Sequence, residues 1–454
     1  MQELNALGIE KLSVPWRQGG WRGMFILNKT RDLFWYLLVT GLLAGQPVAF
    51  ASPLELVKPE KLGISSQRLA RVNQVAQRYV NQHRVTGIVT LISRRGQPVQ
   101  SSVLGQMGLD NRAPMQLDTL FRIFSMTKAM TAVGALILYE QGEFHLDDPV
   151  EKFIPELKQM NVFEEASLVK ARTAMTMHQL FTHMSGLSYG YPRDHPVAEL
   201  VEWADPRISD SSAEFIDKLA RLPLRSHPGD AWNYSFSSDV LGVVIERITG
   251  LALADFLQIN LFGPLGMVDT GFAVPPHKLH RLASSHRWDQ VNQVIRLIEE
   301  HHDGDQAYRV NGFDSGESGL ISTAPDYHRF LDMLRNGGRY GDRQIVSPKL
   351  IKYMGQDHLP TSITEANIGP NHDRSLGLGG GHGLGIGVYI DPVRRGVLSS
   401  KGELDWGGVA GTIFWLDPQE DIIVVSMIQL FASPWRLRDD LSVALYQALT
   451  DVYE

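Results

Sequence analysis

The sequence contains no cysteine, and this absence excludes several chemistries at once. Disulfide bridges, thiolate metal sites, a cysteine nucleophile and a lipid-modified cysteine anchor all need a residue that the 454-residue chain lacks. An excess of positive charge is also missing, since 43 Lys and Arg stand against 50 Asp and Glu, a net charge of −7. The chain is therefore not expected to bind nucleic acid, which requires clustered basic residues.

What the chain does contain is typical of a globular protein. Charged residues make up 20% and hydrophobic residues 43% of the sequence, which excludes disordered, collagen-like and coiled-coil proteins. A chain of this length can bury a large core and suggests two or three domains or subdomains.

The first 51 residues have the pattern of an export signal rather than of a folded domain. Lys29 and Arg31 precede the apolar run 33–43, and residues 49–51 (Ala-Phe-Ala) place small side chains two apart, as at a signal-peptide cleavage site. Counted from Met24, a signal that ends at Ala51 has the ordinary length of such segments, so we expect Met24 to be the true start.

The alternative is a segment that is kept as a membrane anchor. The stretch 33–51 carries no charge and is just long enough to span a bilayer. We expect an exported protein, periplasmic or secreted, whose mature part is 52–454. The alternative is a protein tethered to the inner membrane by 33–51.

Two β-hairpins are predicted, one near each end of the mature chain. The first joins 86–93 to a strand that ends near Val103. The second joins 411–416 to 422–430 through the polar turn 417–421. Hairpins at both ends of a long middle region suggest one sheet built from both ends. Helical patterns lie at 125–141, 213–222, 238–248, 254–260, 324–336 and 438–453.

The segment 121–141 carries the most chemical information. Residues 129–139 contain no charge, which predicts a buried helix, and Gly142 offers its C-terminal stop. Ser125 and Lys128 lie at the start of this helix, three residues apart and so on one face. Burial is expected to lower the pKa of Lys128, and a partly neutral lysine can activate a serine. S-x-x-K is a catalytic signature of penicillin-binding proteins and serine β-lactamases.

Two look-alike motifs are weighed against this one. Ser167 and Lys170 have the same S-x-x-K spacing, but they lie in a charged stretch, 164–172, that is typical of a solvated face. Ser188 lies in a G-x-S-x-G sequence, yet that elbow needs a strand before it and a helix after it. The preceding residues are polar and interrupted, so Ser188 is expected in a loop, with Tyr189 and Tyr191 as candidates for a pocket wall.

Neither a cofactor nor a metal is predicted. The glycine-rich stretch 377–387 fits neither G-x-G-x-x-G nor a P-loop, and it is interpreted as a loop that enters a strand at 384–390. The histidines lack the spacing of a metal motif. Those considered and set aside as ligands, with one aspartate, are His301, His302, Asp303, His372 and His382.

Six blocks in order resemble the serine β-lactamase-like family, in its class C β-lactamase and family VIII carboxylesterase branch, over roughly residues 60–450. The blocks are FSMTKAMTAVGALILYEQGEFHLDDPV (124–150), LFTHMSGL (180–187), HPGDAWNYSFSSDVLGVVIERITG (227–250), PLGMVDTGF (264–272), SGLISTAPDY (318–327) and WGGVAGTIFWLDP (406–418).

The resemblance implies an α/β fold of the α+β type, an antiparallel sheet flanked by helices with a mostly helical region beside it. The sheet part is expected from about 60–130 and 315–454, and the helical part from about 131–314. The active site is expected in the groove between the two parts.

The resemblance also implies roles for individual residues. Ser125 corresponds to the family's nucleophile, and Lys128 with Tyr234 of the second motif to its shared general base. The oxyanion hole corresponds to the main-chain N–H groups of Ser125 and Val409. Trp406, Gly407 and Gly408 form the third motif. The implied reaction is acyl transfer through a serine-bound acyl-enzyme.

Two departures from the motifs favour esters over lactams. Trp406 stands where β-lactamases and transpeptidases usually have a lysine that holds the substrate carboxylate, and Phe236 stands where an asparagine would bind a substrate amide. Both changes are expected to leave an apolar pocket. We therefore expect a carboxylesterase acting on a small-molecule ester. The alternatives are a β-lactamase or D-Ala peptidase-type amide hydrolase and a non-catalytic binding relative, and the oligomeric state stays open.

Overall fold

The computed structural model describes residues 55–190, 193, 195–298, 312–363 and 376–453. The predicted signal or anchor, with Met24 and the 49–51 cleavage pattern, lies outside the described residues. Across the part of the chain that is described, no helix has both the length and the apolar character needed to cross a bilayer.

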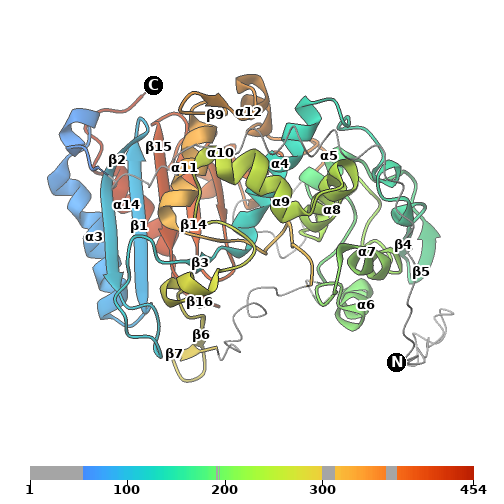
Figure 1. Cartoon of the computed structure of the whole chain (residues 1–454), viewed down its shortest axis with the longest axis horizontal. Helices are drawn as coiled ribbons and strands as arrows, with labels where there is room; N and C mark the ends of the chain where they lie inside the picture. The colour runs from blue at the N-terminus through green and yellow to red at the C-terminus, as the bar shows by residue number, and fades with distance from the viewer. Residues whose placement is uncertain (1–54, 191–192, 194, 299–311, 364–375, 454) are drawn as a thin grey trace, which may run out of the picture. The chain divides into compact units, whose positions relative to one another are not determined.

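The largest sheet has seven strands, all antiparallel, in the order β11-β12-β13-β14-β15-β1-β2. Both predicted hairpins are confirmed as β1–β2 and β14–β15. Strand β1 pairs with β15 in a register that sets Val89 opposite Met427, so strands from both ends of the described chain lie side by side (Figure 1). The strands are β1 Gly87–Arg94, β2 Gln97–Gly105, β11 Gly380–His382, β12 Gly387–Tyr389, β13 Leu404–Gly407, β14 Ile413–Asp417 and β15 Ile422–Met427.

Helices cover both faces of this sheet. On one face α3 (Ser66–Asn81) and α14 (Leu437–Tyr446) pack on each other and on a core that includes Ile88 and Ile92. On the other face α11 (Ala324–Arg335) packs on a core that includes Val89. Neighbouring residues of a strand point to opposite faces. Burial of both faces therefore explains why β1 and β15 are apolar without alternation.

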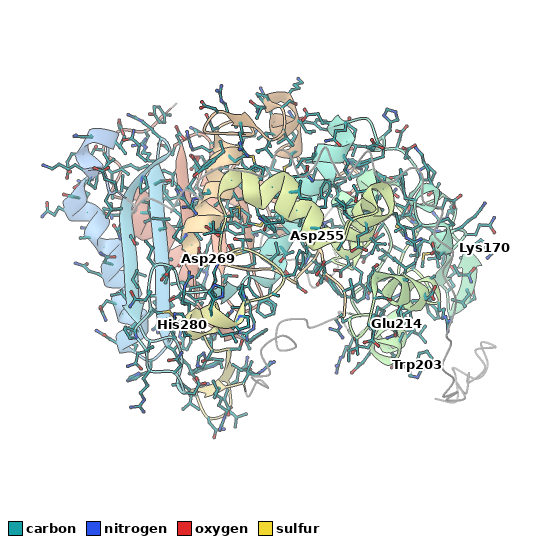
Figure 2. All side chains as sticks on the ribbon, viewed as in Figure 1. Lys170, Trp203, Glu214, Asp255, Asp269 and His280 are labelled. Atoms are coloured by element: carbon teal, nitrogen blue, oxygen red, sulfur yellow. The ribbon has the colours of Figure 1, made fainter. Side chains whose placement is uncertain are left out.

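The segment between α4 and α11 contains small helices and two short hairpins. Its side chains include the exposed Lys170 on a hairpin and Trp203, which is 80% exposed (Figure 2). The helices are α5 Met177–Phe181, α6 Pro196–Ala204, α7 Ser212–Ala220, α8 Ser237–Thr249, α9 Leu253–Leu257 and α10 Gly263–Leu265. The hairpins are β4 Asn161–Glu164 with β5 Ser167–Lys170, and β6 His286–Asp289 with β7 Val294–Leu297.

Several short elements complete the fold. They are α12 Pro348–Met354, α13 Pro392–Arg395, β3 Phe121–Arg122 with β8 Ile321–Ser322, β9 Arg339–Tyr340 with β10 Arg343–Gln344, and β16 Leu430–Phe431 beside β6.

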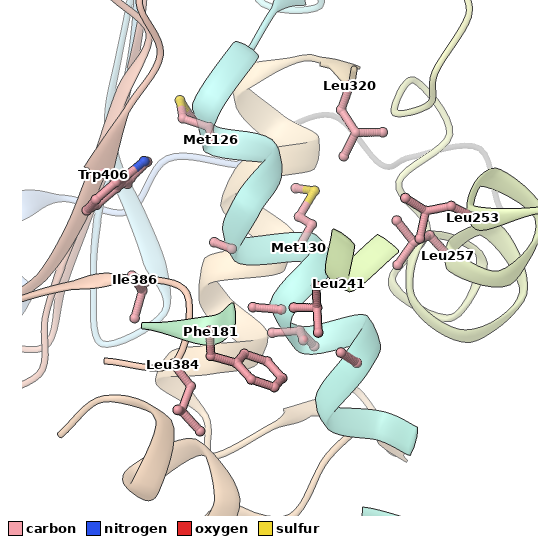
Figure 3. Packing of buried hydrophobic residues seen from close by; sticks show 14 of the residues in the cluster. Met126, Met130, Phe181, Leu241, Leu253, Leu257, Leu320, Leu384, Ile386 and Trp406 are labelled. Carbon is pink, nitrogen blue, oxygen red and sulfur yellow. The ribbon is translucent and has the colours of Figure 1, made fainter. Parts of the chain in front are cut away.

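Helix α4 (Thr127–Glu140) is the predicted buried helix, and the structure confirms it. Every residue from 127 to 138 is buried. Phe181 of α5, Leu241 of α8 and Leu384 of the glycine-rich stretch pack around it (Figure 3). Gly142, at φ +82°, follows its C-terminal end in the left-handed conformation that glycine adopts at helix ends. A helix enclosed on all sides gives the residues at its N-terminal end a fixed position.

Candidate active site

Ser125 lies in a single 3₁₀ turn, Phe124–Met126, that leads directly into α4. Phe124 has φ +43°, a conformation that is unfavourable for an aromatic residue. Its ring packs edge-on against Phe431, with the ring centroids 5.1 Å apart. The strained residue directs the chain so that Ser125 is only partly buried, while Met126 beside it is completely buried.

Lys128, one turn further along, points back at this serine. Its Nζ donates a hydrogen bond to Ser125 Oγ at 3.2 Å and a longer one to the main-chain oxygen of Glu317 at 3.4 Å. Nζ also lies 4.5 Å from the centre of the Tyr234 ring. The structure thus brings together Ser125, Lys128 and Tyr234, although the tyrosine comes from a segment far along the sequence.

The pKa of Lys128 shifts in the direction opposite to our prediction. Burial lowers it, as expected, but the negative charge of Glu317 and the contributions of Tyr234 and Asp239 outweigh burial, so the pKa is raised. Glu317 Oε1 lies 3.8 Å from Nζ. The sequence-based expectation considered the apolar helix alone and missed the carboxylates that other segments bring to the lysine.

Two buried carboxyl groups accompany Lys128. Burial raises the pKa of Glu317 to about 7 and that of Asp239 to about 6, and in both cases the charge of Lys128 opposes the rise. Because a buried lysine and a buried carboxyl each cost free energy when charged alone, they are stable as ions mainly as a pair. The two carboxyl groups therefore favour the charged form of Lys128.

Tyr234 is held by other aromatic rings. Its ring lies 4.8 Å from His183, 5.4 Å from Tyr189 and 5.9 Å from Trp232, measured between centroids. The main chain of the preceding residue, Asn233, donates a hydrogen bond to the carbonyl of His183. Tyr189 thus contacts the site, as a wall residue would, whereas Tyr191 lies outside the described residues.

The third motif lies at the end of β13, against the chain just before the nucleophile. Gly408 N–H donates to Thr412 O and Gly411 N–H to Gly408 O, which closes a tight turn around Val409. A side chain at position 408 would clash with the main-chain oxygen of Ile123 and with Thr412. Glycine there lets the turn approach the Ser125 segment closely.

Two predicted pocket residues turn out to be core residues. Phe236 is fully buried, with its ring 4.6 Å from Tyr189 and 5.7 Å from Phe215. Trp406 is 3% exposed and packs against His382 and Tyr234. Both side chains pack in the aromatic cluster that surrounds Tyr234, because apolar rings gain most when they are removed from water. Their contact with a substrate stays a prediction.

The look-alike motifs are not brought to this site. Ser167 and Lys170 lie in the exposed strand β5 (Figure 2), where residues three apart point to opposite faces of the strand. Ser188 is buried in the loop after α5, where its Oγ accepts a hydrogen bond from Gly190 N–H. A helix, not a strand, precedes it, so the nucleophile-elbow geometry is not formed.

No cluster of three or more potential metal ligands occurs among the described residues. His301, His302, Asp303 and His372 lie outside them. His382 is buried beside Trp406, and burial lowers its pKa to about 4, so its ring is neutral at physiological pH.

Glu317 is the site residue that sequence reasoning missed. It directly precedes the recognised block 318–327, and it is the single charged residue within 315–322 (SGESGLIS). An acidic side chain in a run of small and apolar residues, next to a recognised motif, was the available signal. Asp239 was likewise passed over, although it lies within the block 227–250.

Comparisons with known proteins agree with this geometry. The sequence profile of the family described as Beta-lactamase matches residues 72–448. Protein Rv1367c of Mycobacterium tuberculosis is 33% identical, over 76% of this chain and 86% of its own. Esterase EstB of Burkholderia gladioli is 30% identical, over 77% of this chain and 87% of its own. Among solved structures, EstCE1, described as a hydrolase with promiscuous acyltransferase activity, superposes with a TM-score of 0.71 at 25% identity, over 84% of this chain and 99% of its own.

Proposed function

Because the chain belongs to the β-lactamase family and is a serine hydrolase of the carboxylesterase type, we propose that it cleaves carboxylic esters through an acyl-enzyme on Ser125. The observation that carries this proposal is the contact between Ser125 Oγ and Lys128 Nζ at 3.2 Å, with the Tyr234 ring beside the same nitrogen.

In the proposed mechanism Tyr234 Oη and Lys128 act together as the general base. They take the proton of Ser125 Oγ as the oxygen attacks the ester carbonyl. The tetrahedral oxyanion accepts hydrogen bonds from the N–H groups of Ser125 and Val409, and donors of this kind are each worth about 10²–10³ in rate. The same proton passes to the departing alkoxide, which leaves as the alcohol. Water, activated by the same base, then attacks the acyl-enzyme and releases the acid.

The substrate class follows from what the third motif lacks. Trp406 brings no cation to the place where a lysine would bind the carboxylate of a β-lactam or peptide, and Phe236 brings no amide. Both side chains are buried. Among the described residues, these two motif positions therefore bring no anchor for an anionic substrate, which favours a neutral ester.

The decisive experiment is hydrolysis of p-nitrophenyl butyrate by residues 52–454, beside the Ser125→Ala variant and a chromogenic cephalosporin. We expect wild type to hydrolyse the ester, the variant to be inactive, and kcat/KM to be higher for the ester than for the cephalosporin. A higher value for the cephalosporin would replace the esterase by the amide hydrolase. Absence of both activities, together with no fluorophosphonate adduct on Ser125, would favour a binding relative.

Acyl transfer to an alcohol is a second outcome of the same chemistry. The description of EstCE1 as a hydrolase with acyltransferase activity motivates it. It is tested by adding an alcohol to the ester assay: if the alcohol intercepts the acyl-enzyme, the new ester forms while p-nitrophenol release does not fall.

We also propose that the domain acts outside the cytoplasm, on the signal-like pattern of 33–51. N-terminal sequencing of the protein from its natural host is the test. A mature chain that begins at Ser52 supports cleavage, whereas a chain found in membranes with 33–51 intact supports the anchor.

A further inference from the structure

Glu317 places a carboxyl group beside Lys128 that the proposed mechanism does not use. Its Oε1 lies 3.8 Å from Nζ, and its main-chain oxygen accepts a hydrogen bond from the same nitrogen at 3.4 Å. The side chain is only 12% exposed. Its second oxygen, Oε2, is buried and has no hydrogen-bond partner among the described residues. A buried carboxylate with so little compensation is stabilised chiefly by the neighbouring ammonium group.

The segment that carries Glu317 is fixed to both helices of the site. Asp239 Oδ1 of α8 accepts hydrogen bonds from Ser315 Oγ at 2.7 Å and from Glu317 N–H at 3.2 Å. Thr131 Oγ1 of α4 donates to Gly316 O at 2.6 Å. These hydrogen bonds hold the main chain around Glu317, so its carboxyl group has a fixed place next to Lys128.

Several titratable groups face Lys128 from the packed elements. Glu317 and Asp239 supply negative charge. His183 and His382 lie close enough for the charge of Lys128 to disfavour their protonation, and burial lowers the pKa of both, so they are neutral. The ring of Tyr189 is 5.7 Å and that of Tyr234 4.5 Å from Nζ. The charge balance at Lys128 is therefore set by the two carboxylates.

We propose that Glu317 is a positioning residue of the acyl-transfer site, which holds Lys128 against Ser125 through an ion pair. This inference rests on the proposed function. The base that Lys128 and Tyr234 form together takes the Ser125 proton during attack and delivers it to the leaving alkoxide, while the carboxylate of Glu317 keeps Lys128 in place.

The test is the pH dependence of kcat/KM in wild type, Glu317→Gln and Glu317→Asp. Loss of a negative charge makes any nearby group easier to deprotonate. The rising limb of the Glu317→Gln profile should therefore move to lower pH, by about one unit, as expected for a charge within roughly 4–6 Å. kcat should fall about tenfold with little change in KM, because Glu317 contacts Lys128 and not the substrate. Glu317→Asp keeps the charge and should return the midpoint toward that of wild type.

Glu246→Gln is the matched control. Glu246 is another part-buried carboxyl, two turns beyond Asp239 on α8, whose Oε1 accepts a hydrogen bond from Leu253 N–H. Its neutralisation should leave the midpoint in place. If Glu317→Gln lowers thermal stability but does not move the midpoint, or if Glu246→Gln moves it equally, Glu317 is merely structural and the proposal is overturned.

A second readout does not depend on turnover. Lysine ε-carbon NMR, with the Lys128 signal assigned by its loss in Lys128→Arg, reports the charge of Lys128 directly. Its titration should move to lower pH in Glu317→Gln. If the Lys128 titration is the same in Glu317→Gln as in wild type, the two residues do not form an ion pair, even if the enzyme is active. If wild type hydrolyses no ester, the proposed function fails and the catalytic role of Glu317 fails with it, whereas the NMR titration still decides whether the two residues form a charged pair.

Discussion

Ser125–Lys128 and Ser167–Lys170 have identical S-x-x-K spacing and opposite surroundings. The first pair lies at the start of a helix that is buried on every side, and its two polar atoms are 3.2 Å apart. The second lies on an exposed strand, where the spacing directs the two side chains away from each other. A spacing therefore has chemical meaning only with the secondary structure that carries it.

The largest expected difference between the two pairs is the loss of the serine. Ser125→Ala should lower kcat on p-nitrophenyl butyrate by about 10⁵–10⁶-fold, because it removes the nucleophile. Ser167→Ala should leave kcat unchanged, since its side chain is exposed and is not brought to the site. Steady-state kinetics and fluorophosphonate labelling measure both. Equal activity of wild type and Ser125→Ala would show that Ser125 is not the nucleophile.

Substitution of the two lysines should give a smaller difference in activity than substitution of the two serines. Lys128→Ala should lower kcat/KM by about 10²–10⁴-fold, the range for a positioned acid–base group, whereas Lys170→Ala should behave as wild type. The comparison is made on purified proteins with matching circular dichroism. A Lys128→Ala variant that retains more than about a tenth of the wild-type rate would contradict the role of Lys128.

The buried carboxyl group of Glu317 should also give the protein a pH-dependent stability. Burial raises the pKa of Glu317 from 4.5 to about 7, so the folded state binds a proton there more tightly than the unfolded chain. The resulting stabilisation is complete below about pH 4.5 and is lost as pH rises to about 7. Urea unfolding of wild type and Glu317→Gln should show a stability difference that changes by about 3 kcal/mol over this interval. Glu165→Gln, on the exposed hairpin, is the control for the loss of a carboxyl group far from Lys128 and is measured over the same pH range.

The smallest expected effect concerns the third serine motif. Ser188→Ala should leave esterase activity unchanged and lower the free energy of unfolding by about 1 kcal/mol, because it removes the buried acceptor of the Gly190 N–H. Chemical denaturation and the ester assay measure the two quantities. A loss of activity comparable to that of Ser125→Ala would make Ser188 the better nucleophile candidate.

Local patterns in the sequence were enough to predict much of this fold. The hairpins β1–β2 and β14–β15 follow from apolar runs around polar turns, and α4 follows from its charge-free length. Helices α3, α6 and α12 were not predicted. In α3 the buried positions, such as Leu69, Val72 and Ala76, recur at intervals of three and four residues, which is typical of an amphipathic helix, and the prediction overlooked this pattern. Its helix is stabilised by packing on the sheet and on α14, a partner that lies near the opposite end of the sequence.

The candidate site was predicted in its residues but not in its electrostatics. Ser125, Lys128 and Tyr234 come together as the motifs indicated. The raised pKa of Lys128 was not predicted, because it depends on Glu317, which lies in a distant segment and is brought to the lysine only by the fold. The burial of Phe236 could not be predicted from the sequence either, because the rings that cover it, such as that of Tyr189, come from separate segments. Motifs identify groups, whereas pKa values and exposure depend on the neighbours that only the fold supplies.

The pairing of β1 with β15 has a consequence for biosynthesis. Strand β1 is made early, but its partner ends at Met427, close to the other end of the sequence, so the central sheet cannot close until almost the whole chain has left the ribosome. The buried Arg94 likewise forms its ion pairs with Glu420 and Asp451 only after those late residues have been synthesised. Such long-range pairing slows folding and leaves apolar strands exposed to other chains for longer. The central sheet of this protein is therefore completed only after its C-terminal strands have been synthesised.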